Sequence, residues 1–280
     1  MGAYMRFPGG KSKALTLSYD DGVRQDKHLV EILDKYGIKA TFNINSGCYS
    51  DKVDHEVTKG RMSEKEVYEL FKDSPHEVAI HGYEHGYDEI LPNNLMANEI
   101  LQDRINIEKL TGKITRGMAY PYGTFNDKLV ECLKACGIAY SRTVISTEKF
   151  SMPDDWLRLK PTCHHKSERL MELGDMFLKG NPRIAQMFYL WGHSYEFDEN
   201  TPNSNWELIE EFAKKMGGHD DIWYATNIEI YDYTKAFEAL EFSTDGKIVH
   251  NPTATDVWFV KLPWGERTPI KVEAGKTIRL

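Results

Sequence analysis

The chain has 280 residues, of which 41% are hydrophobic and 28% charged, and its formal net charge is -8. This composition is typical of a globular protein with an ample core, and it excludes a disordered or fibrous chain. The negative charge and the lack of a dense lysine or arginine cluster argue against a nucleic-acid partner. No apolar run predicts a membrane span, and no signal-peptide core precedes the first predicted strand. We therefore expect no membrane association and a cytoplasmic location, or a secreted or periplasmic one if a leader has been removed.

The first predicted strand ends in two adjacent carboxylates. Residues 14–20 alternate apolar and polar side chains, and Gly22 lets the backbone turn sharply after Asp20 and Asp21. Neighbouring strand residues point opposite ways, so the two acids should face different neighbours. One arrangement that separates two like charges has one carboxylate on a metal ion and the other acting as a base. Taken alone, Asp-Asp-Gly is more typical of a turn.

Strands and helices are predicted to alternate along the first 230 residues. Helices are predicted at residues 25–36, 63–72, 94–110, 127–136, 168–178 and 205–216. Further strands are predicted at residues 39–45, 77–80, 138–143, 187–191 and 222–226. Repeated alternation of this kind predicts parallel strands with right-handed crossovers. The expected fold class is therefore α/β, a distorted (β/α) barrel of about seven parallel strands, with the chemistry at the carboxyl ends of the strands.

Two histidines follow the predicted strand at residues 77–80. His81 and His85 are four residues apart, and imidazole nitrogens bind zinc and similar ions. With Asp21 they would form a set of two histidines and one carboxylate, which leaves coordination positions open for water and substrate. A lone H-x-x-x-H spacing is more typical of two surface histidines.

Four motifs occur in a fixed order along residues 14–230. They are Ser18-Tyr-Asp-Asp-Gly22, His81-x-x-x-His85, Arg116-Gly-Met-Ala-Tyr-Pro-Tyr-Gly123 and Leu190-Trp-Gly-His193. This order resembles the polysaccharide deacetylases, the NodB-homology group of carbohydrate esterases, and it is far more specific than any one motif. The resemblance implies a metal-dependent hydrolase that removes acetyl groups from an N-acetylated sugar or polysaccharide.

The resemblance also implies a role for each residue of the acidic and histidine motifs. Asp20 would be the catalytic base, and Arg116 would pair with it. A divalent ion, zinc first, with cobalt, nickel or manganese as alternatives, would be held by Asp21, His81 and His85.

The remaining site residues are inferred with less support. The resemblance implies that the backbone amide of Tyr122 contributes to the oxyanion hole and that His193 is the general acid. Asp155 and Trp156 match only in part a motif whose aspartate tunes the histidine and whose tryptophan walls the acetyl pocket. His164 closes a short predicted strand and could reach the substrate pocket. Two residues after the last barrel strand, Asn227 and Glu229, have the same status.

The sequence departs from the family pattern at two places. Gly82 replaces a serine or threonine, which removes a hydroxyl expected to fasten the metal loop. Trp191 and Gly192 precede His193 where the family more often has a plain aliphatic strand, so the acetyl pocket is expected to be reshaped.

The pattern of predicted elements changes near Ser243. Short strands separated by Gly, Pro and Asp turns predict a small antiparallel β appendage. We therefore expect a barrel over residues 1–240 and an appendage over residues 241–280. Such a tail more often caps the barrel or builds a dimer than contacts carbohydrate, and we favour the cap; exposure of Trp258 or Trp264 would favour carbohydrate contact.

Three functions stay open at this point. An O-acetyl esterase or other linear-amide hydrolase could use the same site. A carbohydrate-binding protein without turnover would be favoured by a missing base or ligand, and none is missing. The expected partner is an acetylated carbohydrate, and a homo-oligomer stays open.

Overall fold

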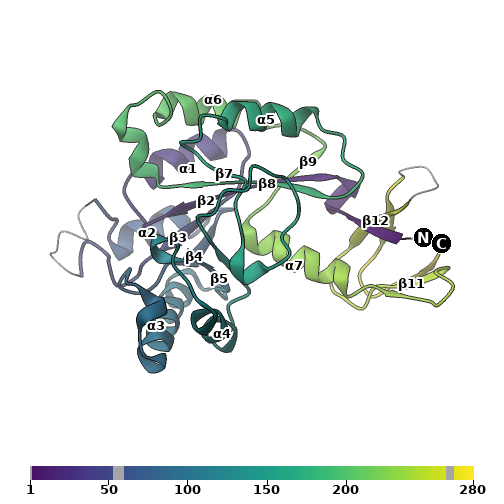
Figure 1. Cartoon of the computed structure of the whole chain (residues 1–280), viewed down its shortest axis with the longest axis horizontal. Helices are drawn as coiled ribbons and strands as arrows, with labels where there is room; N and C mark the ends of the chain where they lie inside the picture. The colour runs from purple at the N-terminus through teal and green to yellow at the C-terminus, as the bar shows by residue number, and fades with distance from the viewer. Residues whose placement is uncertain (1, 53–59, 263–267) are drawn as a thin grey trace.

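The computed structural model describes residues 2–52, 60–262 and 268–280 of the chain. In these residues an α/β body with a central sheet is joined to a smaller all-β part at one end, where both chain termini lie (Figure 1). The strands of the central sheet are β2 (Lys13–Asp20), β3 (Ala40–Ile44), β4 (Glu77–Ile80), β5 (Gly117–Ala119), β6 (Tyr140–Arg142), β7 (Cys163–His164), β8 (Gln186–Gly192) and β9 (Ile222–Tyr224).

All neighbouring strands of this sheet pair in parallel. Their order is β6-β5-β4-β3-β2-β8-β7, and β9 pairs with β2 beside that path. The sheet forms a half-barrel, so the predicted distorted (β/α) barrel of parallel strands is confirmed. Parallel pairing also brings the carboxyl ends of the strands to one edge, which is where the predicted motifs lie.

Seven helices of the described residues connect or flank these strands. They are α1 (Asp26–Lys35), α2 (Glu64–Phe71), α3 (Asn93–Thr111), α4 (Asp127–Ala135), α5 (Leu170–Lys179), α6 (Trp206–Met216) and α7 (Asn227–Glu238). Ser63 forms a capping box with Glu66, Asn126 caps α4, and Gly112 ends α3 in a left-handed conformation, so these three signals are confirmed. No helix in the described part of the chain is long and apolar enough to cross a membrane.

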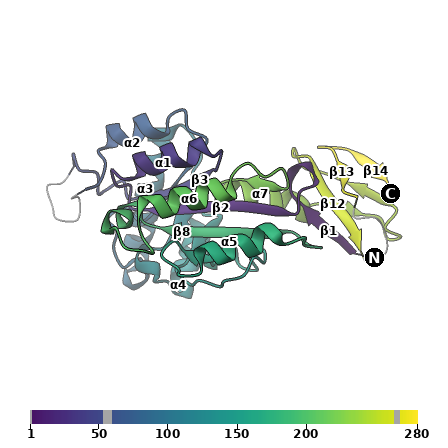
Figure 2. The ribbon, with the colours of Figure 1, turned by 90° about the horizontal axis from the view of Figure 1, so that it is seen from above.

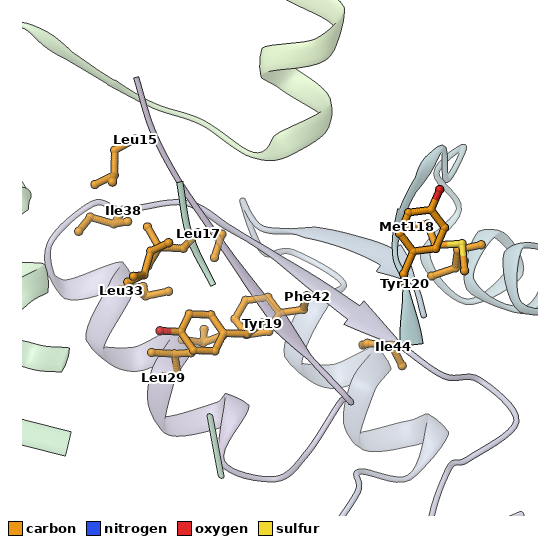
Figure 3. Packing of buried hydrophobic residues seen from close by; sticks show 14 of the residues in the cluster. Leu15, Leu17, Tyr19, Leu29, Leu33, Ile38, Phe42, Ile44, Met118 and Tyr120 are labelled. Carbon is orange, nitrogen blue, oxygen red and sulfur yellow. The ribbon is translucent and has the colours of Figure 1, made fainter. Parts of the chain in front are cut away.

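Strand β2 separates two environments. Leu15, Leu17 and Tyr19 point to one face and pack with Leu29 and Leu33 of α1 in the main core (Figure 3). Because side chains alternate along a strand, the intervening residues point to the other face, which is largely polar. Asp20 lies on that inner face, so the strand that anchors the core also delivers a carboxylate to the interior of the half-barrel.

The smaller part contains two antiparallel sheets, which Figure 2 shows at the end of the molecule that holds both termini. Their strands are β1 (Gly2–Arg6), β10 (Glu241–Phe242), β11 (Ile248–His250), β12 (Val257–Leu262), β13 (Ile270–Val272) and β14 (Thr277–Arg279). The orders are β1-β12-β13 and β10-β11-β14. The predicted antiparallel appendage is therefore present, and it also recruits the first residues of the chain, which were expected in the barrel. The division into two domains stays a prediction.

The appendage packs against α7 through a small core that includes Ala236, Leu240 and Phe259. Trp258 is partly buried, and the Lys271 ammonium lies 5.3 Å from its ring centre. Trp264 lies outside the described residues. The appendage thus packs on the end of the α/β body, and its role as a cap stays a prediction.

Candidate active site

Six of the predicted site residues meet at the carboxyl ends of β2, β4, β5 and β8. They line one cavity of about 400 Å³ and are Asp20, Asp21, His81, His85, Tyr122 and His193. Each follows or ends a strand of the parallel sheet, so residues distant in the chain come together there.

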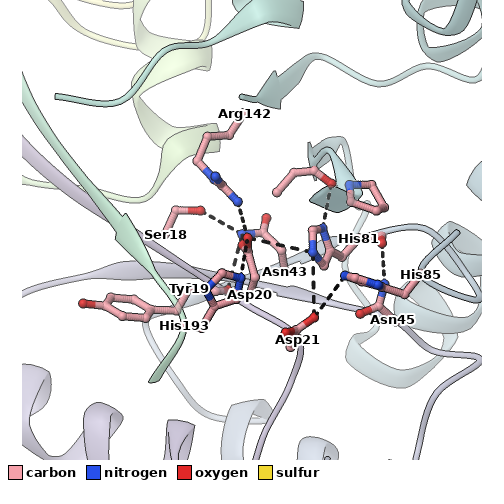
Figure 4. A network of polar contacts seen from close by, with 12 residues as sticks. Ser18, Tyr19, Asp20, Asp21, Asn43, Asn45, His81, His85, Arg142 and His193 are labelled. Carbon is pink, nitrogen blue, oxygen red and sulfur yellow. Dashed lines mark hydrogen bonds and ion pairs between the residues drawn. The ribbon is translucent and has the colours of Figure 1, made fainter. Parts of the chain in front are cut away.

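Asp21, His81 and His85 face one another (Figure 4). The Asp21 Oδ1 atom lies 3.3 Å from Nε2 of His85 and 3.9 Å from Nε2 of His81. One ligand atom from each of the three residues lies within 4.8 Å of the other two. The structure therefore brings the predicted ligand set together.

The protonation of the two rings suits a divalent ion. Nδ1 of His81 lies 2.8 Å from the carbonyl oxygen of Ala119, and because that oxygen only accepts hydrogen bonds, Nδ1 carries the proton and Nε2 is free. Burial lowers the pKa of His81 and, with the neighbouring ring of His81, lowers the pKa of His85 to about 4. Two neutral imidazoles and one carboxylate form a typical donor set for a catalytic zinc.

Asp21 is held ionised by Arg61. Burial by itself raises the pKa of Asp21, but the Arg61 guanidinium, whose Nη2 lies 3.0 Å from Asp21 Oδ1, and the nearby histidines lower it overall. Arg61 Nη1 also donates to Oδ1 of Asn45 at 2.7 Å. This arginine, which the sequence did not single out, therefore links the acidic strand end to the strand beside it.

Backbone contacts fasten the histidine loop. The Asn45 side-chain amide donates to the carbonyl oxygens of His81 and Gly82, the latter at 2.7 Å, and the Asp103 carboxylate accepts from the His81 amide at 3.0 Å. Gly82 has a φ of 75°, which favours glycine over the serine or threonine of the family pattern. The loop therefore lacks the serine or threonine hydroxyl of the family pattern, but the Asn45 amide and the Asp103 carboxylate hold it in place instead.

Strained backbone is concentrated at this site. Among the described residues, five that are not glycine have positive φ, and three of them are Asp21 (84°), His85 (56°) and Tyr122 (56°). Left-handed conformations cost about 1–3 kcal/mol each and persist where the surrounding structure imposes them. The placement of these side chains thus has a local conformational cost.

Asp20 is almost fully buried and is surrounded by donors. Its Oδ2 pairs with the Arg142 guanidinium, and its Oδ1 accepts a hydrogen bond from Asn43 Nδ2 at 2.8 Å. Burial raises the pKa of Asp20, but the charge of Arg142, with smaller contributions from the histidines, lowers it below its ordinary value. Asp20 is therefore ionised at neutral pH, as a general base must be.

The prediction that Arg116 pairs with Asp20 is wrong. Arg116 precedes β5 and lies at the opposite end of the strand from the site, where its Nη2 is 2.6 Å from Asp232 of α7. Arg142 ends β6 and lies beside Ala119 at the carboxyl end of β5. Its guanidinium carbon is 4.3 Å from the ring centre of Trp191, so the tryptophan that departs from the family pattern supports the arginine.

His193 lies between two carboxylates. Its Nε2 is 3.9 Å from Asp20 Oδ2, and its Nδ1 is 3.2 Å from Glu196 Oε2. Burial lowers the pKa of His193, but the hydrogen bond to Glu196 and the charges of the acids raise it overall. The ring is therefore more readily protonated than an ordinary histidine, as a general acid at neutral pH requires.

Glu196 also contacts His164, His165 and Lys166. Nε2 of His164 lies 3.2 Å and Nε2 of His165 3.3 Å from Glu196 Oε2, and Nζ of Lys166 is 2.9 Å from Oε1. The Lys166 amide donates to Nδ1 of His164 at 3.1 Å, so Nε2 of that ring holds its proton and points it at Glu196. Although His164, His193 and Glu196 are close enough to bind a second ion, this tautomer fits a hydrogen-bonded group better.

Gly192 makes room for this cluster. A Cβ atom at residue 192 would lie 2.0 Å from Nδ1 of His165. The glycine before His193 is therefore required by the neighbouring histidine, and the local departure from an aliphatic strand has a packing cause.

Several weaker predictions are wrong. Trp156 is buried against Tyr231, and Asp155 caps a short turn and pairs with Arg158 at 2.6 Å, so neither is among the described residues that line the cavity. His164 contacts Glu196 behind His193 and does not line it either. Asn227 and Glu229 belong to α7, a helix that was not predicted. Asn227 is hydrogen-bonded to Thr16 and Tyr189. Glu229 is hydrogen-bonded to the Thr226 amide and forms an ion pair with Lys39.

Comparison with known proteins agrees with this geometry. Residues 8–141 match the family model described as polysaccharide deacetylase. The search of curated proteins found no match. The structure is similar to a protein assigned as a polysaccharide deacetylase from Mycobacterium smegmatis, with a TM-score of 0.60 and 15% identity over 85% of this chain and 95% of that one.

Two further solved structures share the fold. A family 4 carbohydrate esterase from Streptomyces lividans, in complex with acetate, gives a TM-score of 0.50 and 17% identity over 76% of this chain and 92% of that one. A mutant with restored enzymatic activity of a family 4 (CE4) pseudoenzyme from Bacillus anthracis gives 0.50 and 18% identity over 82% and 70% of the two chains. Residues 8–141 therefore match the polysaccharide deacetylase family, and the solved structures show that the chain shares their fold.

Proposed function

We propose that this chain is a metal-dependent hydrolase that removes acetyl groups from an N-acetylated sugar or polysaccharide. The observation that carries the proposal is the joint placement, in one cavity, of a two-histidine, one-carboxylate set, an ionised Asp20 and a protonatable His193. An acid and a base with opposite pKa shifts, side by side, are what acyl transfer to water requires.

Asp21, His81 and His85 would hold the ion, for which zinc is our first choice. When bound, such an ion acts as a Lewis acid on the acyl carbonyl and lowers the pKa of water. Asp20 takes the proton of the attacking water and is kept ionised and in place by Arg142. The backbone amide of Tyr122 is the proposed hydrogen-bond donor to the oxyanion.

His193 would then protonate the leaving nitrogen. An amine is too basic to depart as an anion, so a positioned imidazolium is needed. Glu196 accepts from Nδ1 and thereby directs Nε2 toward the cavity. In this scheme Glu196 positions the acid, His193, and Arg142 positions the base, Asp20.

The test is acetate release from three substrates measured side by side: chitooligosaccharide, acetyl-xylan and a small N-acetyl compound. We expect release from the N-acetylated carbohydrate, loss after EDTA treatment and recovery with zinc. Asp21→Asn should lose both activity and zinc binding, whereas Asp20→Asn should lose activity and still bind zinc. Because a pseudoenzyme shares this fold, turnover has to be measured and not binding alone. Activity that is indifferent to chelator would refute the proposal.

A further inference from the structure

We propose that Arg61 and Asn45 form a bridge that holds the carboxylate ligand and the histidine loop in place, so that a divalent ion binds to a site that is already assembled. Both are positioning residues, because they would act on the ion only through Asp21 and His81. This inference rests on the proposed function for the site. It adds two residues, one of them outside every sequence motif, on which the metal affinity depends.

Arg61 contacts Asp21 at two points. Its Nη2 lies 3.0 Å from Asp21 Oδ1, and its Nη1 donates a hydrogen bond to the backbone carbonyl oxygen of Asp21. Asp21 has a φ of 84°, a conformation that persists only where the surrounding structure imposes it. The donors of a guanidinium lie in one rigid plane, so bonds to both groups fix the side chain relative to the backbone. Arg61 therefore sets the direction of the carboxylate.

The oxygen that Arg61 contacts is the one that faces the histidines. Asp21 Oδ1 lies 3.3 Å from Nε2 of His85 and 3.9 Å from Nε2 of His81. A carboxylate oxygen has two lone pairs, so it can accept a hydrogen bond from Arg61 and still offer a lone pair to an ion. Ligands of metal sites are usually oriented by such outer hydrogen bonds. The geometry of Arg61 is therefore that of an outer partner of a ligand.

Asn45 continues the bridge to the histidine loop, beside which it lies in Figure 4. Arg61 Nη1 donates to Asn45 Oδ1 at 2.7 Å. The Asn45 side-chain NH₂ in turn donates to the carbonyl oxygens of His81 and Gly82. Asn45 is only 1% exposed, so bulk water cannot replace a partner that is removed. Both ends of this amide are used, and they connect Arg61 to the loop that carries the two histidine ligands.

The backbone of Arg61 is itself fixed to the turn that follows Asp21. Arg61 pairs with Val23 in an antiparallel bridge, and the Met62 amide donates to the carbonyl oxygen of Gly22 at 2.9 Å. The guanidinium is also buried, with 8% of the side chain exposed. A side chain that is held in this way can orient a ligand before any ion binds.

A positioning role and a purely electrostatic role of Arg61 predict opposite signs. Arg61 is a cation beside a site for a dication, so by charge alone its removal would tighten metal binding. Removal of an outer partner of a ligand instead weakens metal binding by about 10–100-fold, and this is the result we expect for Arg61→Met. Arg61→Lys keeps the charge, but a single ammonium cannot reproduce the bonds of the guanidinium to Asp21 and Asn45. We therefore expect Arg61→Lys to bind zinc about tenfold more weakly than the native chain.

The test is the zinc affinity of the full chain, measured by calorimetry on Arg61→Met, Arg61→Lys, Asn45→Ala and the double variant of Arg61→Met with Asn45→Ala. The double variant should bind zinc no more weakly than the weaker single variant, because both changes break the same bridge. Arg24→Met is the matched control, since the Arg24 side chain is 53% exposed and contacts Ser50 and Glu66. It should bind zinc as the native chain does. Thermal unfolding without zinc verifies that each variant is folded.

A spectroscopic measurement separates positioning from a loss of stability. The visible absorption of bound cobalt reports the ligand geometry, and it should change in both Arg61 variants and stay native in Arg24→Met. If Asn45→Ala does not fold, the two Arg61 variants decide the inference.

Equal or tighter zinc binding by Arg61→Met, or native affinity in Arg61→Lys, would overturn the bridge. The absence of zinc binding by the native chain would overturn it as well. Failure of the proposed function has a different signature: the variants lose zinc affinity as expected, but the zinc-loaded native chain releases no acetate from any substrate.

Discussion

Arg142→Met should damage activity and stability together, because Arg142 is the charge partner of the buried Asp20. Arg142 is fully buried and Asp20 nearly so, and the variant would leave a carboxylate in the interior with only Asn43 and two histidines nearby. Removing one partner of a buried ion pair costs about 3–5 kcal/mol of folding free energy. Displacing a catalytic group by about 1 Å can cost a further 100-fold in rate.

The pH dependence gives the sign of the effect. Arg142 lowers the pKa of Asp20, and the base works only when ionised, so its loss should move the acidic limb of the kcat/KM profile to higher pH. The stabilisation from the ionised pair is present above the ordinary aspartate pKa and is lost as the pH falls through the lowered one. The stability difference between native protein and variant should therefore shrink on acidification.

The matched control is Arg116→Met, which removes an arginine that the motif favoured but the structure pairs with Asp232 on the surface. It should retain activity within about twofold, since exposed ion pairs contribute about 0–1 kcal/mol. Acetate release and zinc binding by calorimetry are measured on both variants, with thermal unfolding to verify the fold. A double variant, Arg142→Met with Asp20→Asn, should be more stable than the sum of the single losses predicts. An inactive Arg116→Met beside an active Arg142→Met would refute the reasoning.

Three further predictions concern the surroundings of the acid and the base. Glu196→Gln should lower the pKa of His193 and move the basic limb of the rate profile to lower pH; an unmoved limb in the pH profile would contradict this. Gly192→Ala should cost about 1–3 kcal/mol in denaturant unfolding through its clash with His165, and His165→Ala in the same chain should recover part of it. Burial raises the pKa of Asp26 to about 8, so between about pH 4 and 8 the unfolded state releases a proton that the folded state keeps. Asp26→Asn should therefore raise the unfolding temperature more at pH 8 than at pH 5, and an equal gain at both would exclude this account.

Local signals in the sequence predicted the elements well because each has a local physical cause. The capping box at Ser63 and the glycine that ends α3 satisfy backbone groups within a few residues, so they can be seen without the fold. Helix α7 was missed, although Thr226 and Glu229 form the same kind of capping box. The T-x-x-E pattern was the signal that could have found it.

The ligand set could also be predicted from the sequence, because its members follow strands directly. Asp21 follows the end of β2, and His81 follows β4, so parallel pairing alone is enough to bring them to one edge. The hydrogen bonds that hold the histidine loop could not be predicted, because Asn45 and Asp103 contact it from neighbouring elements. A single motif does not reveal that a side-chain amide and a carboxylate from elsewhere in the chain replace its missing hydroxyl.

The partners of the base and the acid show where a motif stops being informative. Arg116 precedes one short strand and Arg142 ends another, and the resemblance favoured Arg116 because it lies within the matched motif. A three-residue strand has two ends, and only the carboxyl end faces the chemistry in a parallel sheet, so an arginine before β5 is excluded by topology before any distance is measured. The arginine that can serve the base must end a neighbouring strand, and Arg142 does so in register with Ala119. An arginine that ends a predicted buried strand is costly unless a carboxylate meets it, so that mismatch was the available signal for the base partner.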